Sequence, residues 1–97
     1  MTRIVWTLEA ISDLESVRDF IGRTSPHYGN VVAASLVESK DRIMDFPRSG
    51  RIVPELQRED TREVIHGLYR IVYRLLDDER VAEVLTVLRS SRPFPLV

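Results

Sequence analysis

Two arginines, Arg70 and Arg74, share one face of a stretch that alternates like a β-strand, and they offer the clearest chemistry in the sequence. The stretch reads YRIVYRLL and runs from residue 69 to residue 76. Its period of two places Tyr69, Ile71, Tyr73 and Leu75 on one face and Arg70, Val72, Arg74 and Leu76 on the other. A guanidinium carries a rigid fork of N–H donors that suits a carboxylate or a phosphate. The face with the arginines is therefore the first candidate for a functional surface.

Ordinary structural roles compete with function for most of the residues around this face. Arg74 also fits a solvated position on an exposed strand. Arg62 and Glu63 are neighbours on the preceding strand, so they point to opposite faces, and an ion pair across the sheet is the expected role. Tyr73 is expected in the core, and His66, which precedes a glycine, is expected in a turn.

The composition limits the classes of function. The chain of 97 residues is expected to form one domain, residues 1–97. It has 14 basic and 15 acidic residues, and this near-neutral balance argues against a protein that binds nucleic acid on its own. It has no cysteine and only two histidines, so we expect no metal site. The sequence has no secretion signal and no long apolar run, which favours a cytoplasmic protein.

The first half of the chain reads as a short strand followed by two helices. The strand is expected at residues 3–6, the first helix at residues 8–22 behind the N-cap Thr7, and the second helix from Pro26 to Phe46, where Pro47 stops it. The apolar stripe expected for the first helix consists of Ala10, Leu14, Val17 and Ile21, widened by Ile11 and Phe20. The stripe expected for the second consists of Tyr28, Val32, Leu36, Ile43 and Phe46.

The second half reads as a loop and three strands. Residues 48–60 are expected to form a surface loop, and strands are expected at residues 62–66, 69–76 and 80–89. The last strand is apolar on both faces, which indicates a central strand with Val81, Leu85 and Val87 on one side and Ala82, Val84 and Leu88 on the other. The order β-α-α-β-β-β predicts an α+β fold, with an N-terminal strand, an antiparallel helical hairpin and a three-stranded antiparallel meander.

An ordered set of short motifs spans nearly the whole chain. The set comprises Trp6-Thr7, Ala10, Asp13-Leu14, Ser25-Pro26, Phe46-Pro47, the segment GRIVPE at residues 50–55, Arg62-Glu63, the segment YRIVYR at residues 69–74, Arg89 and Arg92. With this set the chain resembles the ParE/RelE superfamily of small bacterial toxins. The resemblance implies the toxin of a type II toxin–antitoxin pair, held inactive in a hetero-oligomer by a cognate ParD-like antitoxin. DNA would be bound only through the antitoxin.

The superfamily divides by target, and the resemblance implies different site residues for each branch. RelE-like members are ribosome-dependent mRNA endonucleases that use basic residues on the sheet face together with a C-terminal aromatic residue or histidine. Arg70, Arg89 and Arg92 are the candidates for those basic positions. Glu63 stands where a second cation would help, and the tail has Phe94 in place of a tyrosine or histidine. These departures favour the ParE-like branch, which poisons DNA gyrase without catalytic residues of its own and, as the resemblance implies, without a cofactor.

In that branch the functional residues are contacts to other proteins. The antitoxin is expected to lay an extended, partly helical segment into a groove beside the helical hairpin and across the sheet. Charged candidates to contact partner proteins are Arg51, Glu55, Arg62, Arg70 and Arg74. Two other interpretations stay open: a RelE-like mRNA endonuclease, and a toxin fold that has lost toxicity and serves only as a partner in repression.

Overall fold

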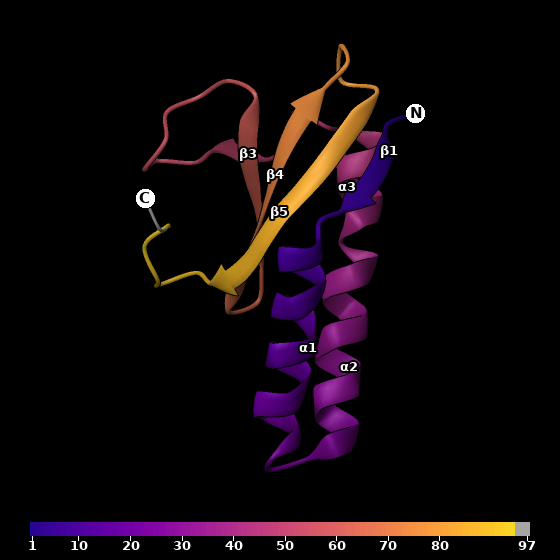
Figure 1. Ribbon diagram of the computed structural model, residues 1–97, viewed down its shortest axis with the longest axis vertical. Coiled ribbons are helices and arrows are strands. Elements are labelled where there is room, and N and C mark those ends of the chain that lie inside the picture. Colours follow the sequence, from indigo (N-terminus) through magenta and orange to yellow (C-terminus); the bar gives the residue numbers. More distant parts are fainter. Residues whose placement is uncertain (95–97) are drawn as a thin grey trace.

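Five strands form one sheet in the order β1-β5-β4-β3-β2 in the computed structural model, which describes residues 1–94 (Figure 1). The elements are β1 (Arg3–Trp6), α1 (Leu8–Gly22), α2 (Pro26–Glu38), α3 (Lys40–Asp45), β2 (Arg51–Ile52), β3 (Thr61–His66), β4 (Tyr69–Leu76) and β5 (Val81–Arg89). Only β1 pairs in parallel, with β5, and the other pairs are antiparallel. The expected α+β fold and the central position of β5 are confirmed.

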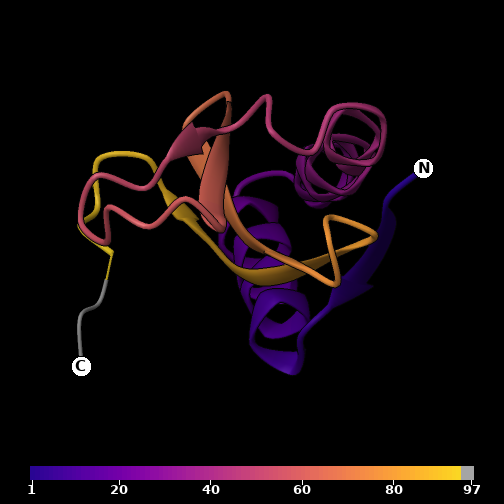
Figure 2. The same ribbon diagram turned by 90° about the horizontal axis from the view of Figure 1, so that it is seen from above.

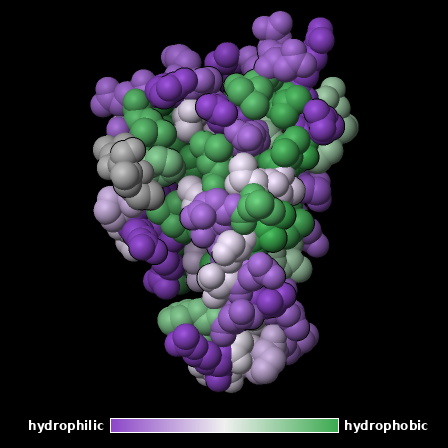
Figure 3. All heavy atoms as spheres, viewed as in Figure 1, coloured by the Kyte–Doolittle hydropathy of each residue, from purple (hydrophilic) through white to green (hydrophobic). Residues whose placement is uncertain are grey.

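The hairpin of α1 and α2 packs on one face of the sheet and projects beyond it (Figure 1). Thr7 and Ser25 cap the two helices, because their hydroxyls accept hydrogen bonds from the first-turn amides of Ala10 and Tyr28. A Cβ at Gly29 would lie 2.5 Å from a backbone oxygen of α1, so only glycine permits this close approach of the helices. On the face seen in Figure 3, apolar residues gather over the sheet and the projecting end of the hairpin is mainly hydrophilic.

The main core lies between the hairpin and the sheet. It contains Ala10, Val17, Leu36, Ile43, Val64, Tyr69, Ile71, Tyr73, Leu75, Ala82, Val84 and Val87. A second, smaller core covers the opposite face, where Val53, Val72 and Leu88 are buried against Leu56, Leu85 and Phe94. The segment between β2 and β3 and the C-terminal end lie together there, away from the helices (Figure 2). The sheet is therefore covered on both faces near Arg70.

The second helix is shorter than expected. It ends at Glu38, and α3 follows after a break at Ser39. The Ser39 hydroxyl donates to the carbonyl of Leu36, and the amide of Arg42 bonds back to Ser39 over three residues instead of four. A serine that competes for backbone groups in this way interrupts a helix.

The apolar stripes expected to be buried on the two helices are also too wide. Ile11, Phe20, Tyr28 and Phe46 are exposed instead of buried. The sheet covers only part of a hairpin that projects beyond it, so Phe20 and Tyr28, toward its free end, have no apolar layer to meet. The residues 48–60 are not wholly irregular either, because they contain the short strand β2.

A β-bulge changes the faces of β5. Val72 pairs with Thr86 while Tyr73 pairs with Val84, so Leu85 is an extra residue. The bulge lies where β1 ends: the Thr7 amide and hydroxyl both donate to the Val84 carbonyl. Because of it, the main core receives Ala82, Val84 and Val87 and the second core receives Leu85 and Leu88. The expected strict alternation along this strand is therefore wrong.

No helix within residues 1–94 is long and apolar enough to cross a membrane.

Candidate functional site: a buried arginine network beside a partly apolar groove

The Arg70 guanidinium is buried in an ion-pair network on the sheet face opposite the helices, with 3% of its side chain exposed. One terminal nitrogen donates to Glu63 at 2.8 Å and to Glu55 at 3.2 Å. The other donates to Glu55 at 2.7 Å and to the backbone carbonyl of Arg92 at 2.6 Å. Glu63 is fully buried and accepts a further bond from Arg51, its partner on β2. The network brings together three of the expected site residues, Arg51, Glu55 and Arg70.

The charges in this network stabilise one another. The hydrogen bonds from Arg70, followed by the bond from the Phe94 amide, lower the pKa of Glu55 to about 2. The bond to Glu55 raises the pKa of Arg70, which opposes the effect of its burial. The two carboxylates and two guanidiniums give the network a net charge near zero, and their mutual pairing offsets the desolvation cost of burying them.

Arg62 and Arg74 lie outside this network. Arg62 points to the other face of β3, as expected, where it pairs with Glu59 and donates to the carbonyl of Gly50 at 3.0 Å. Only 12% of its side chain is exposed. Arg74 pairs with Glu83, its neighbour across β4 and β5, at 3.0 Å. The ion pair across the sheet that the sequence predicts for Arg62 or Glu63 is made by Glu63, with Arg51 and Arg70, whereas Arg62 pairs with Glu59 just before β3. The pair of Arg74 with Glu83 is not among the expected contacts.

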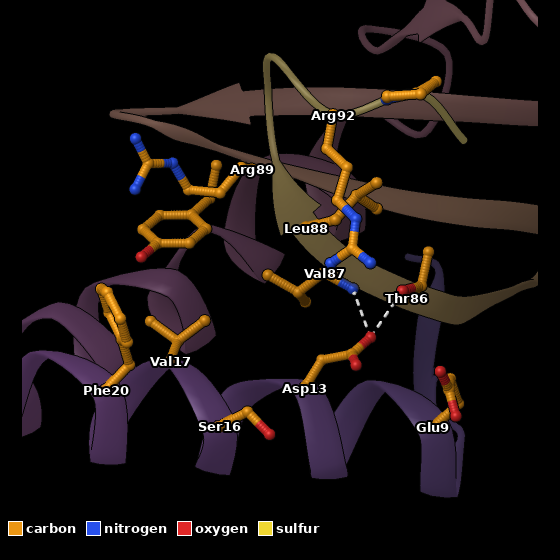
Figure 4. Close-up of a pocket in the computed structure, with 12 residues that line it drawn as sticks. Glu9, Asp13, Ser16, Val17, Phe20, Thr86, Val87, Leu88, Arg89 and Arg92 are labelled. Atoms are coloured by element: carbon orange, nitrogen blue, oxygen red, sulfur yellow. Dashed lines mark hydrogen bonds between the residues drawn. The ribbon is translucent and has the colours of Figure 1, made fainter. Parts of the chain in front are cut away.

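A pocket of about 390 Å³ lies between α1 and β5 (Figure 4). Its lining residues are Glu9, Asp13, Ser16, Val17, Phe20, Tyr69, Thr86, Val87, Leu88, Arg89, Arg92 and Pro93. Asp13 links the two walls, because its carboxylate accepts hydrogen bonds from the Thr86 hydroxyl and from the Val87 amide at 3.0 Å. The bond from the Val87 amide also satisfies a backbone donor at the edge of β5, because the pairing of β1 with β5 ends at Val84.

A second pocket of about 360 Å³ lies between the helical hairpin and the turn that joins β3 to β4. It shares Phe20, Tyr69 and Arg89 with the first pocket, so the two pockets adjoin, and we call them together the groove. Other residues of its lining are Ile21, Tyr28, Val32, Ser35, Leu36, His66, Gly67 and Leu68. The Arg89 guanidinium lies over the Tyr69 ring, 5.8 Å from its centroid. His66 is the last residue of β3, directly before the turn rather than in it, and its ring nitrogen lies 3.2 Å from the Ser35 hydroxyl.

The groove combines aromatic and charged side chains. Phe20 and Tyr28 are more than half exposed and give it apolar walls. Arg89 and Arg92 bring positive charge to it, Glu9 and Asp13 bring negative charge, and within residues 1–94 neither arginine forms an ion pair. Such a surface suits a protein segment with apolar and acidic side chains. Within the same residues, no three His, Asp or Glu side chains come together as metal ligands.

Sequence reasoning missed two parts of this groove. Phe20 and Tyr28 were assigned to the buried stripes, although their position near the free end of the hairpin exposes them. Asp13 was noted only as part of a motif, because its bonding to β5 depends on how the helix and strand cross. An acidic residue one position before a stripe residue, as Asp13 is before Leu14, carries no local signal of an edge contact.

Comparison with known proteins matches this chain to one family of toxins, over most of its length. Residues 4–94 match the profile of a family described as ParE toxin of type II toxin–antitoxin system, parDE. A protein named Toxin RelE2 from Caulobacter vibrioides is 36% identical over 59 residues, which cover 61% of this chain and 67% of that protein. A protein named Putative toxin Y4kP from Sinorhizobium fredii is 31% identical over 97 residues, which cover 98% of this chain and 95% of that protein.

The fold is also found among solved structures. A chain in the structure described as the chromosomal ParDE toxin–antitoxin system from P. aeruginosa matches with a TM-score of 0.75. The match covers 92% of this chain and 96% of that chain at 17% sequence identity. At this identity the likeness concerns the fold.

Proposed function

The chain belongs to the ParE toxin family of type II toxin–antitoxin systems, and from this premise we propose that it poisons DNA gyrase by protein–protein contact and is neutralised by a ParD-like antitoxin. The observation that carries the proposal is the burial of Arg70. This residue is the best match to a basic catalytic position of RelE-like enzymes, yet its side chain is 3% exposed and bonds to Glu55, Glu63 and the Arg92 carbonyl.

An RNA phosphate has no access to such a guanidinium. To stabilise a developing phosphorane charge, a cation must have donors free to point at the phosphate oxygens. Both terminal nitrogens of Arg70 already donate to oxygens of its own chain. The segment from Pro54 to Asp60 and the C-terminal segment also cover this face through the second core. These features favour a toxin that acts without hydrolysis.

The groove is the proposed site for the antitoxin. Its aromatic walls would receive apolar side chains, and Arg89 and Arg92 would receive acidic ones. The similar fold in a solved ParDE toxin–antitoxin system supports a partner of this class. Two other expected contacts, Arg51 and Arg74, keep 59% and 42% of their side chains exposed and remain proposed contacts for a segment that crosses the sheet.

A supercoiling assay tests the proposed target. The toxin is purified away from its antitoxin and titrated into gyrase, ATP and relaxed plasmid. We expect loss of supercoiling and accumulation of linear plasmid, both reversed by the antitoxin. A toxin that binds the antitoxin but leaves gyrase unaffected would contradict the gyrase assignment.

Charge reversal in the groove tests the antitoxin site. The variant Arg89→Glu is compared with Arg18→Glu, which reverses a charge at an exposed position outside the groove. Titration calorimetry should show weaker antitoxin binding for the first variant and wild-type binding for the second. Equal affinities would place the antitoxin elsewhere.

Two observations favour a second candidate, a RelE-like mRNA endonuclease. Arg89 and Arg92 remain exposed in one pocket, and one relative carries the name Toxin RelE2. Mapping of mRNA ends on translating ribosomes separates the two candidates. Cleavage that disappears in Arg89→Ala and Arg92→Ala variants would support the endonuclease.

A further inference from the structure

Arg92 belongs to both features described above. Its side chain lines the groove, where Figure 4 shows the guanidinium lying over β5 near Val87. Its backbone carbonyl accepts the 2.6 Å hydrogen bond from Arg70 in the buried network. Two residues later, the Phe94 amide donates to Glu55 at 2.7 Å. The groove wall and the network are therefore joined through a few residues of main chain.

We propose that Arg70 and Glu55 are positioning residues, which fix the C-terminal segment from Ser90 to Phe94 so that Arg92 forms one wall of the groove. The proposal rests on the proposed function in that the groove receives an acidic antitoxin segment. In this arrangement an antitoxin depends on Arg70 without touching it. Arg70 therefore has a different role from the direct partner contact that its sequence position indicates.

The segment needs such fixation because it lies outside the helices and strands. The Ser90 amide bonds to the Leu68 carbonyl at 2.8 Å, and the Arg92 amide bonds back to the Arg89 carbonyl at 2.9 Å. Neither bond reaches beyond Arg92. The bond from Arg70 holds the Arg92 carbonyl, and the bond to Glu55 holds the Phe94 amide. Phe94 also packs against the second core. Ordering each freed residue costs backbone entropy, so an unattached end would not stay in one place.

Charge separates the roles of the two arginines. The charge of Arg70 is compensated by Glu55 and Glu63, and the residue is buried, so it attracts an acidic partner weakly. Arg92 is exposed and, within residues 1–94, forms no ion pair. A carboxylate on the partner would therefore pair with Arg92. The position of Arg92 in that pair would be set by the hydrogen bond that its own backbone carbonyl accepts from Arg70.

The variants that test this proposal are Arg70→Lys, Arg92→Ala and the double variant. Lysine keeps the positive charge but lacks the planar fork that reaches Glu55, Glu63 and the Arg92 carbonyl together. Arg48→Lys is the matched control, because Arg48 pairs with Glu79 and Glu59 instead of with the C-terminal segment. The probe is the antitoxin encoded beside the gene of this chain, measured by calorimetry. The second readout is hydrogen exchange at the Phe94 amide, followed by NMR on the toxin alone.

We expect faster exchange at the Phe94 amide in Arg70→Lys and wild-type exchange in Arg48→Lys. Antitoxin affinity should fall on the order of tenfold in Arg70→Lys, and the double variant should bind no more weakly than Arg92→Ala alone. Additive losses would overturn the proposal, because Arg70 would then act independently of Arg92. Unchanged Phe94 exchange would overturn it too.

A variant that fails to fold does not end the test. Glu55→Ala removes the acceptor of the Phe94 amide from a partly exposed position, and it should give the same loss of protection and the same dependence on Arg92. If the wild-type toxin does not bind the antitoxin at all, the antitoxin part of the proposed function fails. The exchange measurement on the toxin alone still decides whether Arg70 and Glu55 hold the C-terminal segment.

Discussion

The Tyr73 hydroxyl lies 3.2 Å from the Gly50 amide nitrogen, which donates to it, and itself donates to the Pro47 carbonyl at 2.6 Å. Tyr73 is fully buried in β4, so this pair of bonds ties the main core to the segment that leads from α3 into β2. Burial raises the pKa of Tyr73, which keeps the hydroxyl protonated as a donor. The same contact explains why residue 50 is glycine, since a Cβ there would lie 2.5 Å from the hydroxyl.

Replacing Gly50 by alanine should therefore destabilise the fold. The added Cβ would also lie 2.7 Å from the Glu63 carbonyl, and neither neighbour can yield without breaking a bond of the sheet or the core. We expect a loss of roughly 1–3 kcal/mol in the free energy of unfolding, measured by urea denaturation. The control is Gly22→Ala, where a Cβ meets nothing within 4 Å and stability should stay the same or rise slightly. Equal stability of the two variants would contradict the packing described here.

Removal of the Tyr73 hydroxyl tests the same connection without adding atoms. Tyr73→Phe leaves the Pro47 carbonyl and the Gly50 amide without their partner, and we expect a loss of about 1–3 kcal/mol in thermal or urea unfolding. Tyr28→Phe is the matched control, because Tyr28 is 58% exposed and its loss of a hydroxyl should change stability little. A Tyr73→Phe protein as stable as the control would show that the two bonds contribute nothing net.

The sequence predicted the elements well because their signals are local. The alternation at residues 69–76, the cap at Thr7 and the Ser25-Pro26 start depend only on neighbouring residues, and each is found where it was expected. The bulge at Leu85 was not predictable in this way. It arises where β1 ends beside β5, a contact between residues about 80 positions apart.

The site was harder to predict than the fold. The sequence identified Arg70, Glu55 and Glu63 as notable but could not show that they meet, since Glu55 comes from an irregular segment. It also could not show which arginines stay exposed. Exposure of Arg92 and burial of Arg70 depend on how the C-terminal segment crosses the second face of the sheet.

Asp13 should stabilise the edge of β5. Its carboxylate accepts from the Thr86 hydroxyl and the Val87 amide, so Asp13→Ala leaves both donors without this acceptor. We expect a loss of about 1–3 kcal/mol in unfolding free energy and faster hydrogen exchange at the Val87 amide. Asp19→Ala removes a carboxylate that is 71% exposed on the same helix, and its effect should stay within about 0.5 kcal/mol. Unchanged exchange at Val87 would show that the amide has another acceptor.

Phe20 should contribute to partner binding more than to folding. It is 59% exposed and lines both pockets of the groove, so Phe20→Ala should leave the unfolding midpoint nearly unchanged. Antitoxin affinity should fall on the order of tenfold or more, as for an aromatic residue at the centre of an interface. Leu8→Ala is the control, because Leu8 is 86% exposed on the same helix outside the groove. Similar losses for both variants would argue that the groove is not the binding site.

Glu55 should make the stability of the protein depend on pH in acid. Its pKa in the folded protein is about 2, lowered first by the hydrogen bonds from Arg70 and then by the Phe94 amide, against an ordinary value of 4.5. A carboxyl whose pKa is lower in the folded state stabilises the fold above the unfolded value, and this contribution is lost as the pH falls toward the folded value. The relevant window is therefore from about pH 4.5 down to about pH 2.

The comparison of wild type with Glu55→Gln isolates this contribution. Urea midpoints measured across the window should differ most above about pH 4.5 and converge as the pH approaches 2. Asp60, whose pKa Arg58 lowers to about 2, also loses its contribution in this range, but it is present in both proteins and cancels in the difference. A difference that stays constant down to the lowest pH would mean that Glu55 is not held as a carboxylate by Arg70, and the network would then need a different explanation.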